Sequence, residues 1–286
     1  MSELTVSMPT YNSGSYVKEA IESVLLQKEV DFELIVVDDN SKDNTIEIVQ
    51  SIRDPRIRLF ENQQHRGISY CHNLVIKESK SLFIAHVDSD DIVMPGAFRK
   101  MLDHIKSSPD IGQIHCYFFL VDINGRVTRK AFHERRKYVL DNIKPDMDYK
   151  EKLIVNSSIA NGLRTFRKEV FDIVGKFDEK IKCGEDYEMA LRIVDKFRIK
   201  LVPEFLYVVR LHKKNTTPYH KFREVIWWWN RFTICNRLLI TNQVKFLRKK
   251  EYKLYRMLFA QLYYILSYYF IVIKQKFIKK IDEKFS

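Results

Sequence analysis

The stretch that decides the fold is Phe83-Ile84-Ala85-His86-Val87-Asp88-Ser89-Asp90-Asp91. It has the pattern of an apolar strand that ends in closely spaced carboxylates, which repel one another unless a cation binds them. Mg²⁺ and Mn²⁺ take oxygen ligands and usually share them with substrate phosphates, so this strand end suits a nucleoside diphosphate carried by a divalent metal. A turn rich in Asp and Ser, followed by Pro95-Gly96, explains the same run. The run by itself leaves both interpretations open.

A second apolar run ends in acids in the same way, at Phe32-Glu33-Leu34-Ile35-Val36-Val37-Asp38-Asp39. A continuous run of Val, Ile and Leu predicts a strand buried on both faces, as in a parallel sheet covered by helices. Thr5-Val6-Ser7-Met8 predicts an earlier strand, and apolar residues at helical spacing predict a helix after it. Ligands of such α/β sheets bind beyond the carboxyl ends of the strands. We therefore expect Tyr11, Asp39 and residues 88–91 to line one crevice.

The order and spacing of these pieces resemble a family 2 glycosyltransferase with the GT-A fold. The matching segments are residues 6–12, residues 35–45, Asn62 with Gly67 and Asn73, residues 87–91, residues 174–179 with 185–192, and Arg210-Leu211-His212 with Asn215 and Thr216. The resemblance implies an α/β fold, the Rossmann-like GT-A domain of nucleotide-diphospho-sugar transferases, in residues 1–218. We expect a basic, aromatic and helical C-terminal extension in residues 219–286.

The resemblance implies that Pro9, Thr10 and Tyr11 bind the nucleotide after the first strand, and that Asp39 binds it after the second. The ring of Tyr11 would stack on the base. Asp39 would accept a hydrogen bond from the imide nitrogen of uracil, which neutral cytosine cannot donate. Tyr11 could instead pack within its loop, and Asp39 could instead cap the helix that begins near Asp43.

In the acidic run, the resemblance implies that Asp88 and Ser89 contact the nucleotide and that Asp90 coordinates Mn²⁺ or Mg²⁺. Asp91 would act on the metal through water. His212 would complete the metal site or contact the diphosphate, because neutral imidazole is a competent ligand for manganese. Alternatively, His212 is a surface histidine beside two lysines.

The resemblance implies that Asp186 is the general base. It would take the proton of the acceptor hydroxyl as the hydroxyl oxygen attacks the anomeric carbon. Direct attack from the face opposite the diphosphate would invert the configuration. Glu185 and Asp186 could instead be the solvated first turn of a helix through Met189 and Ile193, where acids favour the helix dipole.

Two departures from the family pattern concern the third motif and processivity. Cys71-His72-Asn73 stands where many relatives have an Arg before the Asn, so either His72 or Arg66 would take that nucleotide-binding role. The Gln-x-x-Arg-Trp pattern of processive synthases is absent, which predicts addition of one sugar per encounter.

Composition agrees with one large α/β domain plus an extension: the chain has 286 residues, of which 45% are hydrophobic and 30% charged. The four cysteines are scattered, so we expect reduced packing residues. No secretory stretch precedes the first strand, which favours a cytoplasmic location.

The net charge of +12 is concentrated toward the C-terminus, where lysines and arginines flank the uncharged segment from Met257 to Ile273. That segment is short for a spanning helix and rich in tyrosine. A peripheral helix at the cytoplasmic face of the inner membrane, bound to anionic lipid, fits this pattern, and so does a helix packed on the catalytic domain or on a second subunit. We do not expect nucleic acid as a partner.

The sequence thus predicts transfer of a sugar from a nucleotide-sugar donor, a UDP-linked hexose or N-acetylhexosamine, to a glycan or glycolipid acceptor. The acceptor would belong to a bacterial surface glycan: lipopolysaccharide, capsule or a glycoprotein glycan. Side chains from about Phe119 to Thr165 would select the sugar. The alternative is a noncatalytic protein with a GT-A-like fold that binds nucleotide or anionic lipid.

Overall fold

The computed structural model describes residues 2–122, 148–150, 153, 162–181, 183–212 and 234. The chain divides into two compact units, Met1–Thr217 and Pro218–Ser286. The predicted C-terminal helices, the residues Asn215 and Thr216, and most of the segment expected to select the sugar lie outside the described residues.

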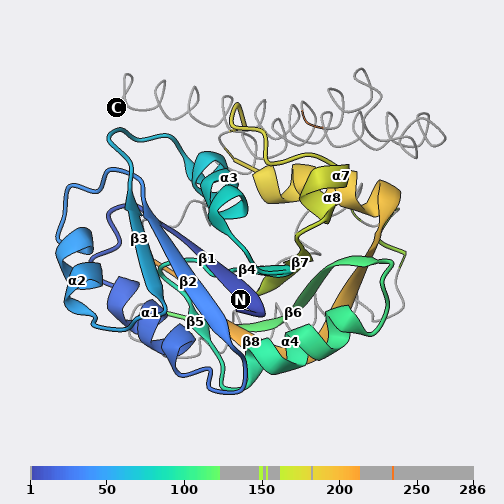
Figure 1. The fold of residues 1–286 in the computed structure, drawn as a ribbon, viewed down its shortest axis with the longest axis horizontal. Helices are drawn as coiled ribbons and strands as arrows, with labels where there is room; N and C mark the ends of the chain where they lie inside the picture. The colour runs from blue at the N-terminus through green and yellow to red at the C-terminus, as the bar shows by residue number, and fades with distance from the viewer. Residues whose placement is uncertain are drawn as a thin grey trace, which may run out of the picture. The chain divides into compact units, whose positions relative to one another are not determined.

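The described strands form one mixed sheet in the order β3-β2-β1-β4-β7-β6-β8-β5 (Figure 1). The strands β1, β2, β3 and β4 run parallel, with the bounds Leu4–Thr10, Phe32–Asp38, Ile57–Glu61 and Phe83–His86. The remaining strands are β5 (Ile92–Val93), β6 (Ile111–Val121), β7 (Arg164–Arg167) and β8 (Arg198–Arg210). β7 pairs antiparallel with both β4 and β6, while β8 pairs parallel with β6 and antiparallel with β5.

Helices cover both faces of this sheet, as the continuous apolar runs predict. The helices are α1 (Val17–Leu25), α2 (Thr45–Ser51), α3 (Ile68–Glu78), α4 (Ala97–Lys106), α7 (Val170–Ile173) and α8 (Glu185–Lys196). Within β2, Leu34 and Val36 pack in one core cluster with α1 and α4, whereas Ile35 and Val37 pack against α3. Successive residues of a strand point to opposite faces, so a strand buried on both faces needs apolar residues at every position.

The parallel half of the sheet brings the acidic strand ends to one edge. Thr10 at the end of β1 is in register with Asp38 at the end of β2, and Ser7 is in register with His86 of β4. The backbone N–H of Asp39 donates to the carbonyl of Thr10 at 2.8 Å. The loops that follow these strands therefore begin side by side.

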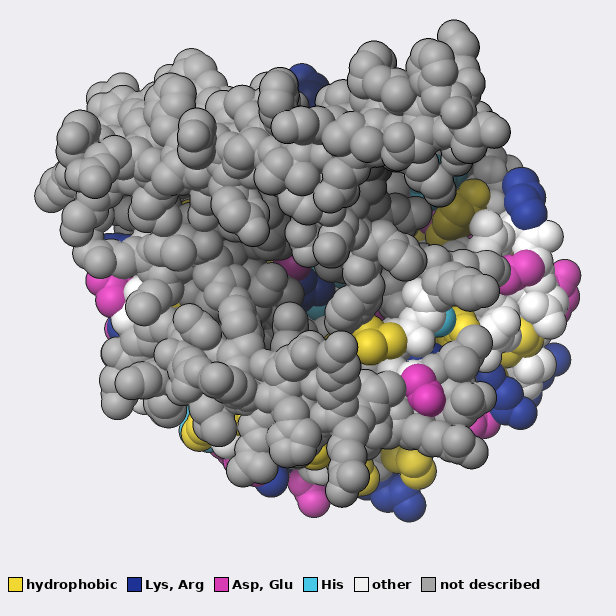
Figure 2. All heavy atoms as spheres, turned by 180° about the vertical axis from the view of Figure 1, so that it is seen from behind, with side chains coloured by type: hydrophobic (Ala, Val, Ile, Leu, Met, Phe, Trp, Pro, Cys, Tyr) yellow, Lys and Arg dark blue, Asp and Glu magenta, His cyan; other side chains and the backbone are white. Residues whose placement is uncertain are grey.

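Within the described ranges, no helix combines the length and the apolar character needed to cross a membrane. The segment from Met257 to Ile273 lies outside those ranges. Figure 2 shows the molecule from behind, where the described lysines, arginines and acidic side chains are interspersed.

Candidate functional site

The loops after β1 and β2 are joined by hydrogen bonds that place Tyr11 at the sheet edge. The N–H of Asn12 donates to Ser41 Oγ, and the N–H of Lys42 donates to Asn12 Oδ1, both at 2.8 Å. Asn12 has φ 51°, in the left-handed region that Asn tolerates better than most residues. Tyr11 is 47% exposed at this edge, and its ring lies 4.4 Å, between centroids, from the ring of His65. Pro9 and Thr10 form the end of β1 beside it.

Asp39 lies buried at the end of β2 and accepts hydrogen bonds from the loop that precedes α3. Its Oδ1 accepts from Asn62 Nδ2 and from the N–H of Arg66, each at 2.8 Å, and its Oδ2 accepts from the N–H of Gly67 at 2.7 Å. The expected alternative, a cap on α2, is wrong, because Asp43 accepts from the N–H of Thr45 there. Asp39 instead holds the 62–67 loop against the end of β2.

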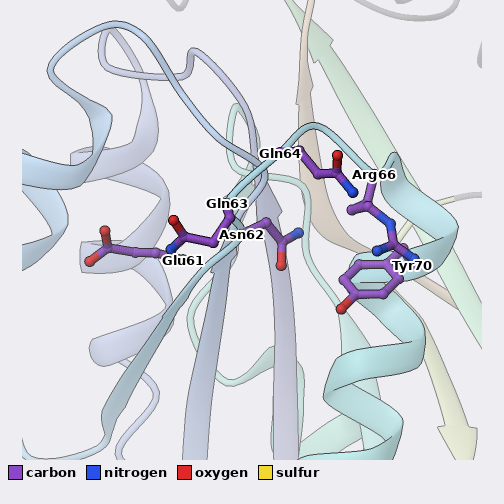
Figure 3. Close-up of a pocket in the computed structure, with 6 residues that line it drawn as sticks. All are labelled: Glu61, Asn62, Gln63, Gln64, Arg66 and Tyr70. Atoms are coloured by element: carbon purple, nitrogen blue, oxygen red, sulfur yellow. The ribbon is translucent and has the colours of Figure 1, made fainter.

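The same loop lines a polar hollow of about 360 Å³, shown in Figure 3. The residues around it are Glu61, Asn62, Gln63, Gln64, Arg66 and Tyr70. The guanidinium of Arg66 lies over the ring of Tyr70, 4.1 Å from its centroid. Asn62 thus faces both the hollow and the carboxylate of Asp39.

The acidic loop after β4 brings three carboxylates together. One carboxylate oxygen of each of Asp88, Asp90 and Asp91 lies within 4.8 Å of the others. The loop is held by β8: the N–H of Asp88 donates to Tyr207 Oη at 2.9 Å, and the N–H of Arg210 donates to Asp91 Oδ1 at 2.9 Å. Asp91 is 3% exposed, which makes it a buried support for the loop.

Burial and mutual repulsion raise the pKa values of two carboxyl groups in this loop. Burial raises the pKa of Asp88 to about 6, which the nearby Arg164 only partly offsets. Burial, with the charges of Asp90 and Asp88 added, raises the pKa of Asp91 well above its usual range. A divalent ion would favour the ionised carboxylates and reverse these shifts. Oxygen ligands with an imidazole nearby suit Mn²⁺ or Mg²⁺.

His212 lies against the acidic loop. Its Nε2 is 2.8 Å from Asp90 Oδ2, and its ring stacks on Tyr16 with centroids 4.6 Å apart. The side chain is 6% exposed, so the alternative of a surface histidine is wrong. Ser89 is also buried, with its Oγ 2.8 Å from Ser13 Oγ in the loop after β1. The residues expected around a metal and a diphosphate therefore come together.

Asp186 lies in the first turn of α8 and is joined to the acidic edge through Arg164 of β7. Arg164 Nη1 donates to Asp186 Oδ2 at 2.7 Å. Arg164 is paired with His86 in the sheet, two positions before Asp88. Burial opposes the charge of Arg164, but Asp186, Asp88 and the adjacent Glu185 outweigh burial and raise its pKa. Burial raises the pKa of Glu185 to about 7, and the charge of Asp186 adds to the shift.

The helix α8 is tied to the segment before it by Arg192, which also forms a buried ion pair within the helix. Arg192 donates through Nε and Nη2 to the two carboxylate oxygens of Glu188, at 2.8 and 2.7 Å. The same guanidinium donates to the carbonyls of Val174, Gly175 and Lys176. The helix that begins with Glu185 is thereby tied to the segment before it.

Asn73 ties that segment to α3. Its Nδ2 donates to the carbonyl of Phe177, and its Oδ1 accepts from the N–H of Phe177, both at 2.9 Å. Asn73 Nδ2 also donates to Glu179 Oε1 at 3.0 Å. The Asn of the third motif therefore holds the segment that leads to Asp186.

His72 is placed in the interior rather than at a ligand surface. It is 2% exposed, stacks on His86 with centroids 3.7 Å apart, and its Nδ1 is 2.9 Å from Ser7 Oγ. Burial, with the nearby Arg164, lowers the pKa of His72 to about 3. A buried neutral ring cannot supply a cation to a diphosphate, so this environment favours a packing role and leaves Arg66 as the alternative.

Sequence reasoning missed three residues of this edge: Arg164, Tyr207 and His65. Arg164 carried only a weak signal. The short strand Arg164–Arg167 has an arginine at each end, and the sequence does not tell which of them faces the site. The sequence carried no signal for Tyr207 or His65. Each contacts an aspartate that is distant in the chain and that only the fold brings near.

Comparisons with known proteins identify the family of the chain and its fold. A model of the family described as "Glycosyl transferase family 2" matches residues 5–174. An uncharacterized glycosyltransferase of Methanocaldococcus jannaschii is 28% identical over 250 residues, which cover 82% of each protein. Similar solved structures are Staphylococcus aureus TarS 1–349 with UDP (21% identity, TM-score 0.60) and the mannosyltransferase PcManGT of Pyrobaculum calidifontis with GDP-Man and Mn²⁺ (18%, 0.65).

The two structural matches cover 82% and 83% of this chain but only 65% and 64% of those chains. They identify the fold as GT-A, while the family match covers more than half of this chain. The chain is a glycosyltransferase and belongs to glycosyl transferase family 2.

Proposed function

We propose that this chain is an inverting, metal-dependent and nonprocessive glycosyltransferase whose donor is a UDP-sugar. One observation carries the proposal: Arg164 joins Asp186 to the strand edge that also bears Asp88 and Asp90. An acceptor-activating carboxylate and a diphosphate-binding loop on one edge are what direct sugar transfer requires. TarS with UDP and PcManGT with GDP-Man and Mn²⁺ share the fold, which supports a nucleotide-sugar donor and a metal.

Each side chain then has a task set by its surroundings. The exposed ring of Tyr11 stacks on the base, and Asp39 accepts a hydrogen bond from the uracil imide. Asp88 accepts from the ribose hydroxyls, and Asp186 takes the proton of the acceptor hydroxyl. A Mn²⁺ or Mg²⁺ ion held by Asp90 and His212 would stabilise the charge that develops on the diphosphate leaving group.

The acceptor side of the proposal rests on the sequence. The acceptor is a bacterial surface glycan or glycolipid, and residues 1–218 supply the catalytic domain. The extension in residues 219–286 holds the enzyme at the cytoplasmic face of the inner membrane.

A donor screen tests the activity directly. Release of the corresponding nucleoside diphosphate is measured from a panel of UDP-, GDP- and CDP-sugars, and a UDP-sugar is expected to give turnover. The early product from an α-linked donor is then examined by nuclear magnetic resonance, which should find a β-linkage. Binding of UDP without release from any donor would favour the noncatalytic alternative, and an α-linked product would exclude simple inversion.

Metal dependence is tested by calorimetric titration of UDP in the presence of Mn²⁺ or of a chelator. UDP binding should weaken strongly with chelator and in Asp90→Asn. Asp103→Asn is the control, because Asp103 lies on α4 in an exposed pair with Arg99. Equal affinity with and without metal would remove Asp90 from the proposed role.

A further inference from the structure

The carboxylate of Asp39 is already surrounded by donors. Besides the three hydrogen bonds from Asn62, Arg66 and Gly67, the Nδ1 atom of His65 lies 2.8 Å from Asp39 Oδ2. An ionised carboxylate has about four lone-pair positions. A further donor, such as a nucleobase imide, can reach Asp39 only if one of these four groups leaves.

His65 is the group that can leave. Two of the other donors are backbone N–H groups at the start of α3, and the third belongs to Asn62, which is anchored at the end of β3 by its N–H to Asp38. The His65 side chain is 55% exposed, whereas Asp39 is 5% exposed. Rotation of an exposed side chain costs less than opening a buried backbone contact.

The ring of His65 also occupies the face of Tyr11. The two ring centroids lie 4.4 Å apart with an interplanar angle of 36°. His65 thus presents a planar ring to Tyr11 and a ring nitrogen to Asp39. These are the two contacts proposed above for uracil.

We infer that His65 occupies the nucleobase position of the donor site and must swing out before the nucleotide binds. The inference rests on the proposed base-binding role of Tyr11 and Asp39. His65 is then a gate: every nucleotide must displace it, and the base regains what His65 supplied only as far as it replaces the stacking on Tyr11 and the contact with Asp39. A pyrimidine with an imide N–H replaces both, whereas neutral cytosine replaces only the stacking.

If His65 is such a gate, removing its side chain should strengthen UDP binding. A protein whose binding-competent state is a minor fraction binds its ligand more weakly by that fraction. If the open state is about 10 to 30% of molecules, removing the imidazole should tighten UDP binding by about three- to ten-fold. Most substitutions in a binding site weaken binding, so a gain is a distinctive result.

The experiment is calorimetric titration of UDP in the presence of MnCl₂ with wild-type protein, His65→Ala and Gln64→Ala. Gln64 is the matched control, because it lies next to His65 in the loop and lines the hollow of Figure 3. His65→Ala should gain three- to ten-fold in affinity and Gln64→Ala should change by less than about two-fold. CDP, titrated in parallel, should gain by the same factor as UDP in His65→Ala, because the fraction of open protein does not depend on which ligand binds.

A spectroscopic readout follows the ring itself. The imidazole resonance of His65, assigned by its disappearance in His65→Ala, should lose the ring-current shift of Tyr11 when UDP is added. UDP binding to all variants with unchanged or weaker affinity in His65→Ala would overturn the gate and leave the donor assignment intact. Failure of UDP to bind any variant would overturn the donor assignment and the gate together.

Discussion

At the scale of single residues, the contact that most shapes the chemistry is the ion pair between Arg164 and Asp186. A guanidinium at 2.7 Å orients the carboxylate of Asp186, and a base must be positioned before the acceptor arrives. Glu185 is the competing base, because it lies in the same turn and has a pKa raised to about 7. A pKa near the working pH is also favourable for a general base.

Two isosteric substitutions separate these carboxylates. If Asp186 takes the acceptor proton, Asp186→Asn should lower kcat by roughly 10²- to 10⁴-fold while donor affinity hardly changes. Glu185→Gln should lower kcat far less, because it removes a neighbour of the base. Initial rates with the donor identified by the screen, together with UDP-sugar titration, measure both quantities.

The opposite ranking would make Glu185 the base and Asp186 the partner that positions Arg164. Parallel loss of kcat and donor affinity in Asp186→Asn would instead show that the Arg164 pair mainly supports the donor site. Thermal unfolding of both variants guards against a general loss of folded protein.

The site residues that the sequence could predict are those whose position depends only on their neighbours in the chain. Asp88, Asp90 and Asp39 end apolar strands, so their position follows from the period and polarity of a few neighbours. The contacts of Arg164 with Asp186, of Tyr207 with Asp88 and of His65 with Asp39 could not be predicted. Each depends on a turn conformation or on a strand pairing that short-range patterns do not specify.

At the scale of elements, the junction of α3 and β4 buries two imidazoles in contact. His72 of α3 stacks on His86 of β4 at an interplanar angle of 4°, with Phe177 and Arg164 beside them. Burial holds the pKa of His72 at about 3, against an ordinary value of 6.5. The folded state therefore takes up fewer protons at this site than the unfolded state as the pH falls below 6.5.

This difference predicts an acid-dependent loss of stability. The contribution of neutral His72 is fully present above about pH 6.5 and is lost progressively as the pH falls toward 3, because only the unfolded chain is protonated in that window. Between about pH 7 and pH 5 the wild type should lose about 2 kcal/mol of unfolding free energy relative to His72→Phe. Urea unfolding of both proteins at the two pH values measures the difference.

The comparison with His72→Phe is needed because other groups titrate in the same range. Asp88 and Glu185 have raised pKa values, so they favour the folded state as the pH falls and oppose the histidine. His104→Phe, on α4, is a control for the substitution itself. Identical pH dependence in wild type and His72→Phe would contradict a buried neutral His72.

The elements themselves were predictable in the parallel half of the sheet. β1, β2, β4, α1 and α8 follow from apolar runs and helical spacing, and the structure confirms them. The antiparallel half was not predicted, because β7 pairs with β4 and β6 across about fifty to eighty residues of chain. Such pairings depend on tertiary context, which overrides local propensity.

At the scale of the whole molecule, the charge is divided very unevenly. Residues 219–286 contain 15 Lys and Arg against 4 Asp and Glu, so they carry +11 of the formal charge of +12. Residues 1–218 are close to neutral, in keeping with the interspersed charges visible in Figure 2. A protein-wide affinity for anions would need basic residues in both parts. The distribution therefore predicts that the proposed contact with anionic lipid is made by the extension.

Removing the extension tests this assignment. Ending the chain before Tyr252 should reduce sedimentation with vesicles that contain phosphatidylglycerol, because each nearby Lys or Arg contributes about 1 kcal/mol of attraction to an anionic surface. UDP binding should stay nearly unchanged, since Tyr11, Asp39 and Asp90 all lie in the first unit. Vesicles of phosphatidylcholine alone are the control for lipid charge.

Salt and charge substitution then separate electrostatic attraction from packing. Raised salt should imitate part of the loss, because the Debye length is only about 8 Å at physiological ionic strength and shortens as salt is added. Full-length protein with Arg248, Lys249 and Lys250 changed to Gln should bind anionic vesicles more weakly and stay folded, because it keeps the length and the apolar segment of the extension. Wild-type protein that ignores anionic vesicles, with a truncated form that aggregates or no longer dimerises, would contradict membrane contact. That outcome would assign the extension to packing against the catalytic domain or a second subunit.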